Sequence, residues 1–244
     1  MTPPLSSWSP DRTKVSPENP KLGSWRHHLV YREERLRTTW KLRAAGALVF
    51  ATAVWLAQPW WTSALGNSLI CSGETAPSDA ILIENFDIDY LLFERARELR
   101  RRGLAPRVLV PVPVDANGSL NRVPAALTRM MGELARLESF EVVPVREVEP
   151  ISMNAARDIL DYLKVKGIRS VMVVTPLFRS KRSELVYDSV FGPAGIAVRC
   201  QPVEGTRDAR SWTESWHGIQ NVVEQWGKLQ YYKFYVMPFA SVAQ

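Results

Sequence analysis

The sequence predicts an α/β domain, a three-layer sandwich around a mostly parallel sheet of about five strands, preceded by one transmembrane helix. Short aliphatic runs alternate with longer segments that carry apolar residues at helical spacing. The unbroken apolar run Val171–Val174 is typical of a strand that is buried on both faces, as in parallel sheets. An uncharged stretch from Ala44 to Gly73 comes before these alternating segments and predicts the membrane helix.

The alternating segments give the order of the elements. Gly103 and Gly167 are expected to end helices, and Ser152 to cap one at its N-terminus. Pro111 is expected to stop a strand, and residues 115–118 to form a turn. Strands are expected at 80–83, 107–110, 140–145, 170–175 and 195–203, with helices at 88–103, 123–137, 152–166 and 178–190.

A longer helix is expected near the C-terminus. Its apolar residues recur at spacings of four, three, four and three, which is typical of one helix face. We expect this stripe to pack in the core rather than to bind a ligand. Placement of the helix across the sheet or on the bilayer is left open. The stripe comprises Trp212, Trp216, Ile219, Val223 and Trp226.

Charge is concentrated at the N-terminal end. The chain has a net charge of +6, and residues 1–43 hold nine Lys and Arg against four Asp and Glu. The remainder is nearly neutral, so the basic balance does not indicate a nucleic-acid partner. The predicted organisation is a disordered cytoplasmic tail at 1–25, a basic juxtamembrane helix at 26–43, a transmembrane helix at 44–64 and an extracytoplasmic α/β domain at 74–240. A buried core helix and a cleaved signal peptide are weaker interpretations of 44–64.

The flanks of the apolar stretch predict its orientation. No Lys or Arg lies between Arg43 and Arg95, so the positive-inside rule places the N-terminus in the cytoplasm. We therefore expect a single-pass protein of the inner (cytoplasmic) membrane, in contact with membrane lipid, with its C-terminal domain periplasmic or extracellular. A disulfide is permitted there, but Cys71 and Cys200 lie in unlike places, and both are expected to be unpaired.

Polar residues after the predicted strands are the candidate site residues, because ligands bind beyond the carboxyl ends of parallel strands. Two arginines at helical spacing after the fourth strand suggest an anionic ligand. Salt bridges from these arginines to Glu184, Asp188 or a neighbouring loop are the structural alternative. His217 is the only histidine of the domain, so no metal site and no cofactor are expected. The ligand-binding candidates are Glu84, Asn85, Asp87, Ser152, Asn154, Thr175, Arg179 and Arg182, with Asp115, Glu147 and Glu149 at equivalent strand ends.

The order of several short motifs, from Asp79 to Pro238, resembles the YdcF/SanA/ElyC-like family, also called domain of unknown function 218. This resemblance implies an envelope-associated α/β domain, and an N-terminal membrane anchor is common in the family. The matching residues are Asp79–Ile83 in the first strand, Ser152 and Asn154 at a helix opening, Val174–Arg182 in the fourth strand and its helix, and Glu224, Lys228, Tyr231 and Tyr232 in the last helix.

Four positions depart from the family pattern. Residues 84–86 replace a glycine-rich turn, Ala155 replaces a threonine, Arg157 replaces an acidic residue, and Arg179 replaces a histidine. The last two exchanges put cations where an acid and a general acid–base group would stand. They favour binding of negative charge over acid–base catalysis.

The expected function is a contribution to cell-envelope or polysaccharide biogenesis through a phosphorylated or lipid-linked glycan ligand. Arg179 and Arg182 would hold the anion, and Ser152 and Asn154 would orient it. No catalytic residue is assigned, because no complete nucleophile–base set is present, and Glu84 and Asp87 are the only candidate bases. The alternative is a non-catalytic scaffold or assembly factor with membrane-protein partners.

Overall fold

A computed structural model describes residues 39–73, 75–86, 89–115, 117–205 and 211–240. The predicted tail at 1–25 and most of the predicted basic helix at 26–43 lie outside these residues. The chain divides into two compact units, Met1–Thr52 and Ala53–Gln244, and the second contains the α/β fold.

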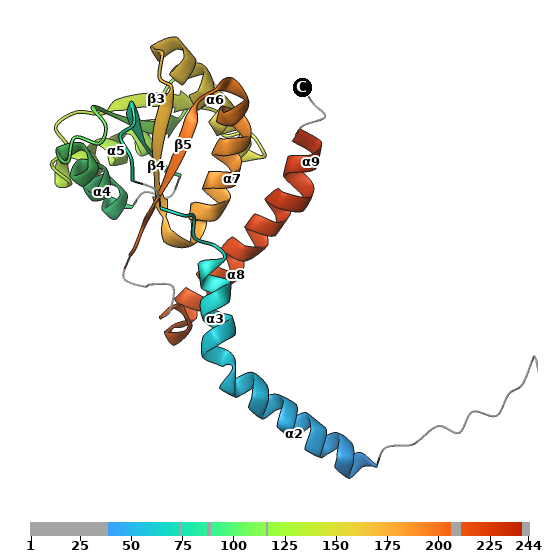
Figure 1. The fold of residues 1–244 in the computed structure, drawn as a ribbon. Helices are drawn as coiled ribbons and strands as arrows, with labels where there is room; N and C mark the ends of the chain where they lie inside the picture. Colours follow the sequence, from blue (N-terminus) through green and yellow to red (C-terminus); the bar gives the residue numbers. More distant parts are fainter. Residues whose placement is uncertain (1–38, 74, 87–88, 116, 206–210, 241–244) are drawn as a thin grey trace, which may run out of the picture. The chain divides into compact units, whose positions relative to one another are not determined.

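The second unit is built on a five-stranded, all-parallel sheet in the order β3-β2-β1-β4-β5 (Figure 1). This confirms the predicted α/β class and strand number. The strands are β1 (Ala80–Ile83), β2 (Arg107–Pro113), β3 (Glu141–Val145), β4 (Ser170–Pro176) and β5 (Ala197–Val203). The helices of this unit are α3 (Gln58–Asn67), α4 (Tyr90–Arg101), α5 (Arg122–Leu134), α6 (Ile151–Lys166), α7 (Ser180–Phe191), α8 (Trp216–Tyr231) and α9 (Met237–Ala240), with short helical turns at Leu177–Arg179, Gly192–Ala194, Trp212–Glu214 and Tyr232–Val236.

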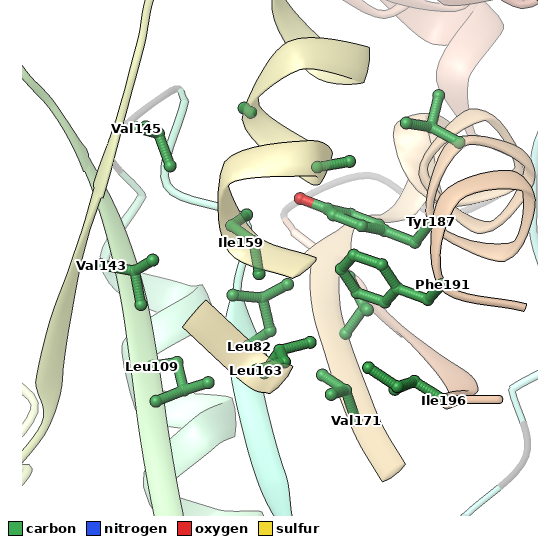
Figure 2. Close-up of a cluster of buried hydrophobic side chains, with 14 of the residues drawn as sticks. Leu82, Leu109, Val143, Val145, Ile159, Leu163, Val171, Tyr187, Phe191 and Ile196 are labelled. Atoms are coloured by element: carbon green, nitrogen blue, oxygen red, sulfur yellow. The ribbon is translucent and has the colours of Figure 1, made fainter. Parts of the chain in front are cut away.

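Alternate residues of the central strands bury their side chains on opposite faces of the sheet. Leu82 and Val171 belong to the cluster formed with α6 and α7, which Figure 2 shows beside Tyr187 and Phe191 of α7. Ile81 and Met172, the preceding and following residues on the same two strands, belong to the cluster formed with α4. The sheet is therefore covered on both faces, and every residue of Val171–Val174 is fully buried, as its unbroken apolar sequence predicts.

The second strand continues through its prolines, where the sequence predicted that it would stop. β1 pairs with β2 only as far as Leu109, whereas β3 pairs with β2 through Pro113. Pro111 therefore lies where β2 has one neighbour instead of two, and its missing N–H costs no ladder hydrogen bond on the open side.

The predicted N-cap at Ser152 is wrong. Helix α6 begins at Ile151 and its N-cap position is Pro150, which follows a cis peptide bond from Glu149. The expected stop at Gly167 is confirmed, because this residue takes the left-handed conformation that glycine adopts without steric cost.

The predicted core stripe of the last helix is also wrong. Trp212 is buried and Ile219 is partly buried, but Trp216 is 72% exposed, Val223 is 57% exposed and Trp226 is 45% exposed. Apolar residues surround much of this helix, so periodicity alone does not select the buried face. Helix α8 buries a different set, which comprises Gly218, Val222, Gln225 and Leu229.

A single membrane helix was expected at 44–64, but the chain forms two helices there. Helix α2 (Trp40–Leu56) and helix α3 are separated at Ala57 and bent by 52°. Pro59 lies in the first turn of α3, where its ring would clash with a continuing helix. Within the described part of the chain, neither helix alone is long and apolar enough to cross a membrane, although the bent pair satisfies length and composition together.

The expectation that both cysteines are unpaired is wrong. Cys71, which follows α3, forms a disulfide with Cys200 of β5. The same region is packed into the domain by Leu69, which is buried with Leu177, Phe178 and Trp212. The sequence gives no indication of this pairing, because the two residues become neighbours only through the fold.

Candidate functional site

The candidate site lies where β4 ends and α7 begins, at the carboxyl edge of the sheet. Thr175 is fully buried near the end of β4, and Arg179 and Arg182 follow in the turn and in the first turn of α7. Both arginines are at least nine-tenths buried. A buried guanidinium needs compensating charge or hydrogen bonds, so the surroundings of these residues define what the site can do.

Glu84 supplies the buried negative charge of the site. It follows β1, is 2% exposed, and accepts hydrogen bonds from the hydroxyls of Thr175 and Ser183, the latter at 2.6 Å. The Thr175 and Ser183 hydroxyls are themselves 3.3 Å apart. The carboxylate is thus enclosed by hydroxyl groups. Two pockets open at this edge of the sheet, and Glu84 lines neither of them. This position makes Glu84 a structural counter-charge.

Arg182 lies between this carboxylate and an aromatic ring. Its guanidinium carbon is 5.5 Å from the centre of the Tyr232 ring, a cation–π arrangement. Burial lowers the pKa of Arg182, and the charge of Glu84 opposes that shift. Arg179 also lowers the pKa of Arg182, because two like charges lie close together. Even so, a guanidinium stays protonated at physiological pH.

Two pockets open at this edge and share two cationic residues, Arg179 and Lys228. The first has a volume of about 670 Å³ and the second about 420 Å³. In the larger pocket, polar lining from α4 and α8 includes Asp89, Asn221 and Gln225. The smaller pocket combines cations, carboxylates, a hydroxyl and aromatic rings, and it is lined by Phe86, Glu147, Glu149, Ile151, Ser152, Arg179, Arg182, Lys228, Tyr231 and Tyr232.

Lys228 is partly balanced by its own helix. Its ammonium group forms an ion pair of 2.5 Å with Glu224, one turn earlier on α8. This pair lowers the pKa of Glu224, with a smaller contribution from Arg179 and Arg182. Lys228 therefore adds only part of its positive charge to the shared edge.

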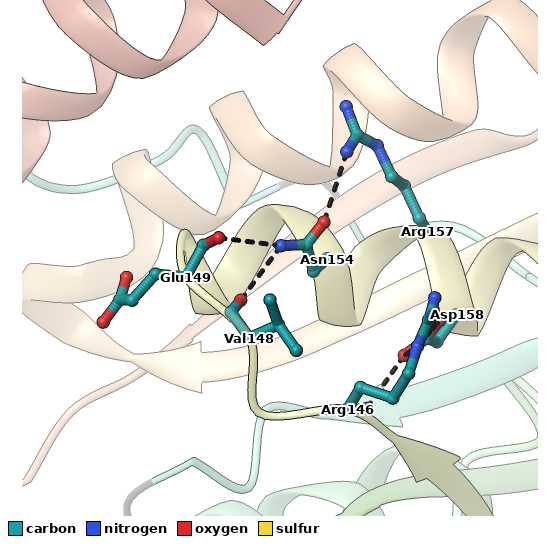
Figure 3. A network of polar contacts seen from close by, with 6 residues as sticks. All are labelled: Arg146, Val148, Glu149, Asn154, Arg157 and Asp158. Carbon is teal, nitrogen blue, oxygen red and sulfur yellow. Dashed lines mark hydrogen bonds and ion pairs between the residues drawn. The ribbon is translucent and has the colours of Figure 1, made fainter. Parts of the chain in front are cut away.

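Asn154 is placed differently from the prediction. Its amide nitrogen donates to the backbone oxygens of Val148 and Glu149, at 3.0 and 3.2 Å, and its amide oxygen accepts from Arg157 (Figure 3). These contacts hold the loop before α6, and Asn154 lines neither pocket. Asn154 therefore shapes the pocket by supporting the loop that carries Glu149.

The other predicted residues differ in their surroundings. Ser152 lines the smaller pocket together with both arginines. Asn85 is buried and donates to the hydroxyl of Thr128 on α5, at 2.8 Å, so it faces away from the arginines' pocket. Asp115 accepts hydrogen bonds from Asn117 and Ser119 in its own turn. Asp87 lies outside the described residues.

The two α7 carboxylates suggested as salt-bridge partners of the arginines have other neighbours. Glu184 is paired instead with Lys181, at 2.6 Å. The charge of Glu184 contributes to a raised pKa of Asp188, after the larger effect of burial. The carboxylates that act on Arg182 are Glu84 and Glu224, from other elements.

Sequence reasoning missed Ser183 and the contribution of α8. Ser183 carries no motif signal, because its role depends on the carboxylate of Glu84, 99 residues away. Lys228, Tyr231 and Tyr232 were noted only as part of a family motif, and the structure places all three in the smaller pocket.

The edge offers cationic, acidic, hydroxyl and aromatic side chains. No group of three or more potential metal-ligating side chains occurs among the described residues. Cations can hold an oxyanion, carboxylates can accept hydrogen bonds from hydroxyl groups, and aromatic rings can stack on a flat apolar face. Comparisons with protein-family models, curated proteins and solved structures give no match to this chain.

Proposed function

We propose that this protein is a membrane-anchored, extracytoplasmic domain that binds a phosphorylated or lipid-linked glycan during cell-envelope or polysaccharide biogenesis. The observation that carries the proposal is the placement of Arg179, Arg182 and Lys228 around one pocket beside Glu147 and Glu149. The arginines would take the phosphate and the glutamates would take sugar hydroxyls. The resemblance to the YdcF/SanA/ElyC-like family supports the same envelope role.

The preference for phosphate rests on the geometry of guanidinium groups. Arginine presents a planar fork of donors that matches the oxygens of phosphate or carboxylate, and its weak hydration favours buried sites. Arg182 is held between Glu84 and Tyr232, so less side-chain entropy is lost when a ligand binds. Glu84 compensates Arg182, and Lys228 adds a further cation to the lining of the smaller pocket.

The membrane assignment rests on α2 and on the charges that precede it. All residues of α2 are exposed, although the helix is rich in Leu, Val, Ala and Phe. An exposed apolar helix is stable in lipid and unfavourable in water. The basic residues lie before this helix, and therefore the C-terminal domain would be on the extracytoplasmic side.

The disulfide supports the same side of the membrane independently. Disulfides persist in oxidising compartments such as the periplasm and the cell exterior, and they are rare in the cytosol. Cys71 and Cys200 both belong to the α/β unit. The charge pattern and the disulfide are unrelated observations, and they favour one orientation.

A lipid-linked ligand fits the way α3 is attached. The indole nitrogen of Trp212 donates to the backbone oxygen of Thr62 on α3, at 3.3 Å, and Lys181 N donates to Leu69 O at 2.9 Å. The chain that leaves the proposed span is thus fixed to the domain at α7. The arginines lie on this same helix and in the turn before it, so they and the segment that follows α3 belong to one packed unit.

The test uses the full-length chain in nanodiscs that contain or lack a polyprenyl phosphate, with inorganic pyrophosphate as a soluble probe. The double variant Glu84→Gln/Arg182→Gln removes both buried charges together, so that neither remains uncompensated. We expect it to weaken binding of the polyprenyl phosphate at least tenfold and to remove the pyrophosphate sites that belong to this edge. Lys164→Ala removes an exposed cation of α6 that lines neither pocket, and it is the matched control.

The binding affinity of each variant is compared with its folding and with its ability to rescue envelope defects in the native host. A double variant that is folded at the assay temperature but fails to rescue envelope defects supports the binding function. A double variant that binds the polyprenyl phosphate with unchanged affinity would overturn it.

The scaffold function is the second candidate, and one observation favours it. The last helical segments expose large aromatic residues to solvent, including Trp216, Phe234 and Phe239. Exposed apolar surface of this kind is typical of contacts with other proteins or with membranes. Full envelope function in a stable double variant that no longer binds phosphate would favour the scaffold over the ligand-binding domain.

A further inference from the structure

A second pocket, of about 470 Å³, lies at the opposite edge of the sheet. It is formed by the last turns of α4 and by the connection from α5 to β3. These segments precede β2 and β3, so they lie at the amino edge of the parallel sheet, away from Arg179 and Arg182. Four arginines and one glutamate account for all but one of its lining residues, which are Arg97, Arg100, Arg101, Arg136, Leu137 and Glu138.

Three of these arginines share one face of α4. Residues 97, 100 and 101 are spaced by three and four positions, which brings their side chains together on a helix. Helix α4 pairs its other two arginines internally, because Glu98 forms ion pairs with both Arg95 and Arg102. The pocket arginines have no such carboxylate partner within ion-pair distance among the residues that the structure describes.

Arg100 is held in place by neutral groups. Its guanidinium donates to the backbone oxygen of Ser139 at 2.7 Å and to the Ser139 hydroxyl at 3.1 Å. These contacts fix the side chain without neutralising it. The negative C-terminal end of the α4 dipole favours basic residues in the last turn, which accounts for Arg100 and Arg101. It does not account for Arg136, which follows α5.

Arg136 occupies a backbone position that favours glycine. It has a φ of 51° and is the single non-glycine residue with positive φ in the described part of the chain. It follows the C-cap of α5, where the N–H of Leu137 bonds to the oxygen of Gly132 at 2.9 Å. Helices α4 and α6 are followed by Gly103 and Gly167 in this left-handed conformation.

A strained residue whose side chain completes a charged pocket indicates a functional constraint. Arg136 costs backbone strain, and it also adds a like charge to three others. Both effects destabilise the protein, and an anion in the pocket would relieve the repulsion between the charges. The strain and the clustering of charge are separate observations, and they concern the same side chain.

We propose that this pocket, which we call the distal arginine pocket, binds a multivalent phosphate-type oxyanion. The guanidinium groups of Arg97, Arg100, Arg101 and Arg136 would hold its oxygens, since arginine binds phosphate through paired N–H donors. The oxyanion is either a free ion or a group on a phosphate-bearing polymer. The site is separate from the one proposed at Arg182 and does not depend on it.

The test measures binding of inorganic pyrophosphate and of linear polyphosphate to the full-length chain in neutral detergent. Sodium chloride at matched ionic strength controls for screening. The Glu84→Gln/Arg182→Gln background removes the contribution of the other edge. In that background we expect both thermal stabilisation by pyrophosphate and saturable binding to remain.

Arg136→Gly is the decisive variant, because it removes the charge and the strain together. Without ligand it should raise the melting temperature, by roughly 2–4 °C for a chain of this size. With ligand it should weaken binding at least fivefold, as should Arg97→Gln. Arg102→Gln, on the same helix but paired with Glu98, is the matched control and should bind like the parent.

The outcomes separate the two sources of the oxyanion. Polyphosphate binding that is far tighter than pyrophosphate binding, and that is lost in Arg136→Gly, identifies a polymer. Comparable affinity for both, also lost in Arg136→Gly, identifies the free ion. Unchanged binding in Arg136→Gly, or an equal thermal shift with sodium chloride, would overturn the distal arginine pocket.

Discussion

The disulfide between Cys71 and Cys200 joins the segment after α3 to β5 across a sequence separation of 129 residues. The backbone N–H of Cys71 also donates to the hydroxyl of Ser180, the first residue of α7, at 3.0 Å. One short segment therefore contacts β5 and the helix that carries Arg182. The chain that emerges from α3 is fixed beside the candidate site by a covalent bond and a buried hydrogen bond.

Removing this disulfide should destabilise the protein substantially. A cross-link across a loop of this length restricts the unfolded chain, and its loss costs about 3–5 kcal/mol in the chain-entropy description. We expect Cys71→Ser/Cys200→Ser to lower the free energy of unfolding by that amount. Denaturant unfolding of the full-length chain in detergent, followed by tryptophan fluorescence, measures the change.

The reduced wild type is the internal control for this variant. A reducing agent should lower wild-type stability to that of the double serine variant and should leave the variant unchanged. Equal stability of oxidised and reduced wild type would contradict the prediction.

Glu84 should be essential for folding because it compensates Arg182 inside the protein. Glu84→Ala removes the acceptor of the Thr175 and Ser183 hydroxyls and leaves the guanidinium without its nearest buried counter-charge. Breaking one side of a buried pair costs roughly 3 kcal/mol. Thermal and denaturant unfolding should show this loss for Glu84→Ala.

Two further variants separate charge from hydrogen bonding at Glu84. Glu84→Gln keeps an acceptor for the hydroxyls and should cost about 1–2 kcal/mol less than Glu84→Ala. Adding Arg182→Gln to Glu84→Gln should restore part of the lost stability. A double variant that is less stable than Glu84→Gln alone would show that the charges do not compensate each other.

The sequence predicts the sheet well because the central strands are buried on both faces. An unbroken run such as Val171–Val174 has few alternatives, and the glycine stop at Gly167 follows from local conformation. The end of β2 was predicted less well. Tolerance of Pro111 depends on which neighbours remain paired at that level of the sheet, and this is a property of the register.

The site was predicted in part for a related physical reason. Arg179 and Arg182 follow from the rule about strand ends, but Glu84 and Tyr232, the partners of Arg182, come from distant segments. The same limit applies to Cys71 and Cys200. The buried face of α8 was predicted wrongly for another reason. Apolar residues on an exposed helix face have the same spacing as apolar residues in a core.

Gly218 should tolerate no side chain, whereas Gly227 on the same helix should benefit from one. A Cβ at Gly218 would lie 2.1 Å from the backbone oxygen of Trp212, so the helix or the preceding turn would have to move. A Cβ at Gly227 would meet no atom within 4 Å. We expect Gly218→Ala to destabilise the protein by about 2–4 kcal/mol and Gly227→Ala to stabilise it by about 0.5–1 kcal/mol.

The two glycine variants control for each other, since both replace a glycine of α8 with alanine. Thermal unfolding of the pair checks the prediction directly. Similar melting temperatures for both would mean that the close approach between α8 and Trp212 is not maintained in solution.

Asp79 should make stability depend on pH in the acid range. Its carboxylate accepts hydrogen bonds from the backbone N–H groups of Arg169 and Ser170, each at 2.9 Å, and these bonds lower its pKa below the ordinary value of 3.8. A lowered pKa in the folded state means that the stabilising contribution is complete above the unfolded-state pKa of about 4. It disappears as the pH falls through the folded-state pKa. Asp79→Asn should therefore cost about 1 kcal/mol at pH 7, a cap-like hydrogen-bonding contribution, and progressively less as the pH falls below about 4. The difference in unfolding free energy between the wild type and Asp79→Asn, measured from pH 7 to 2.5, isolates this residue from the other carboxylates. A difference that stays constant across that range would show that the hydrogen bonds do not depend on the charge of Asp79.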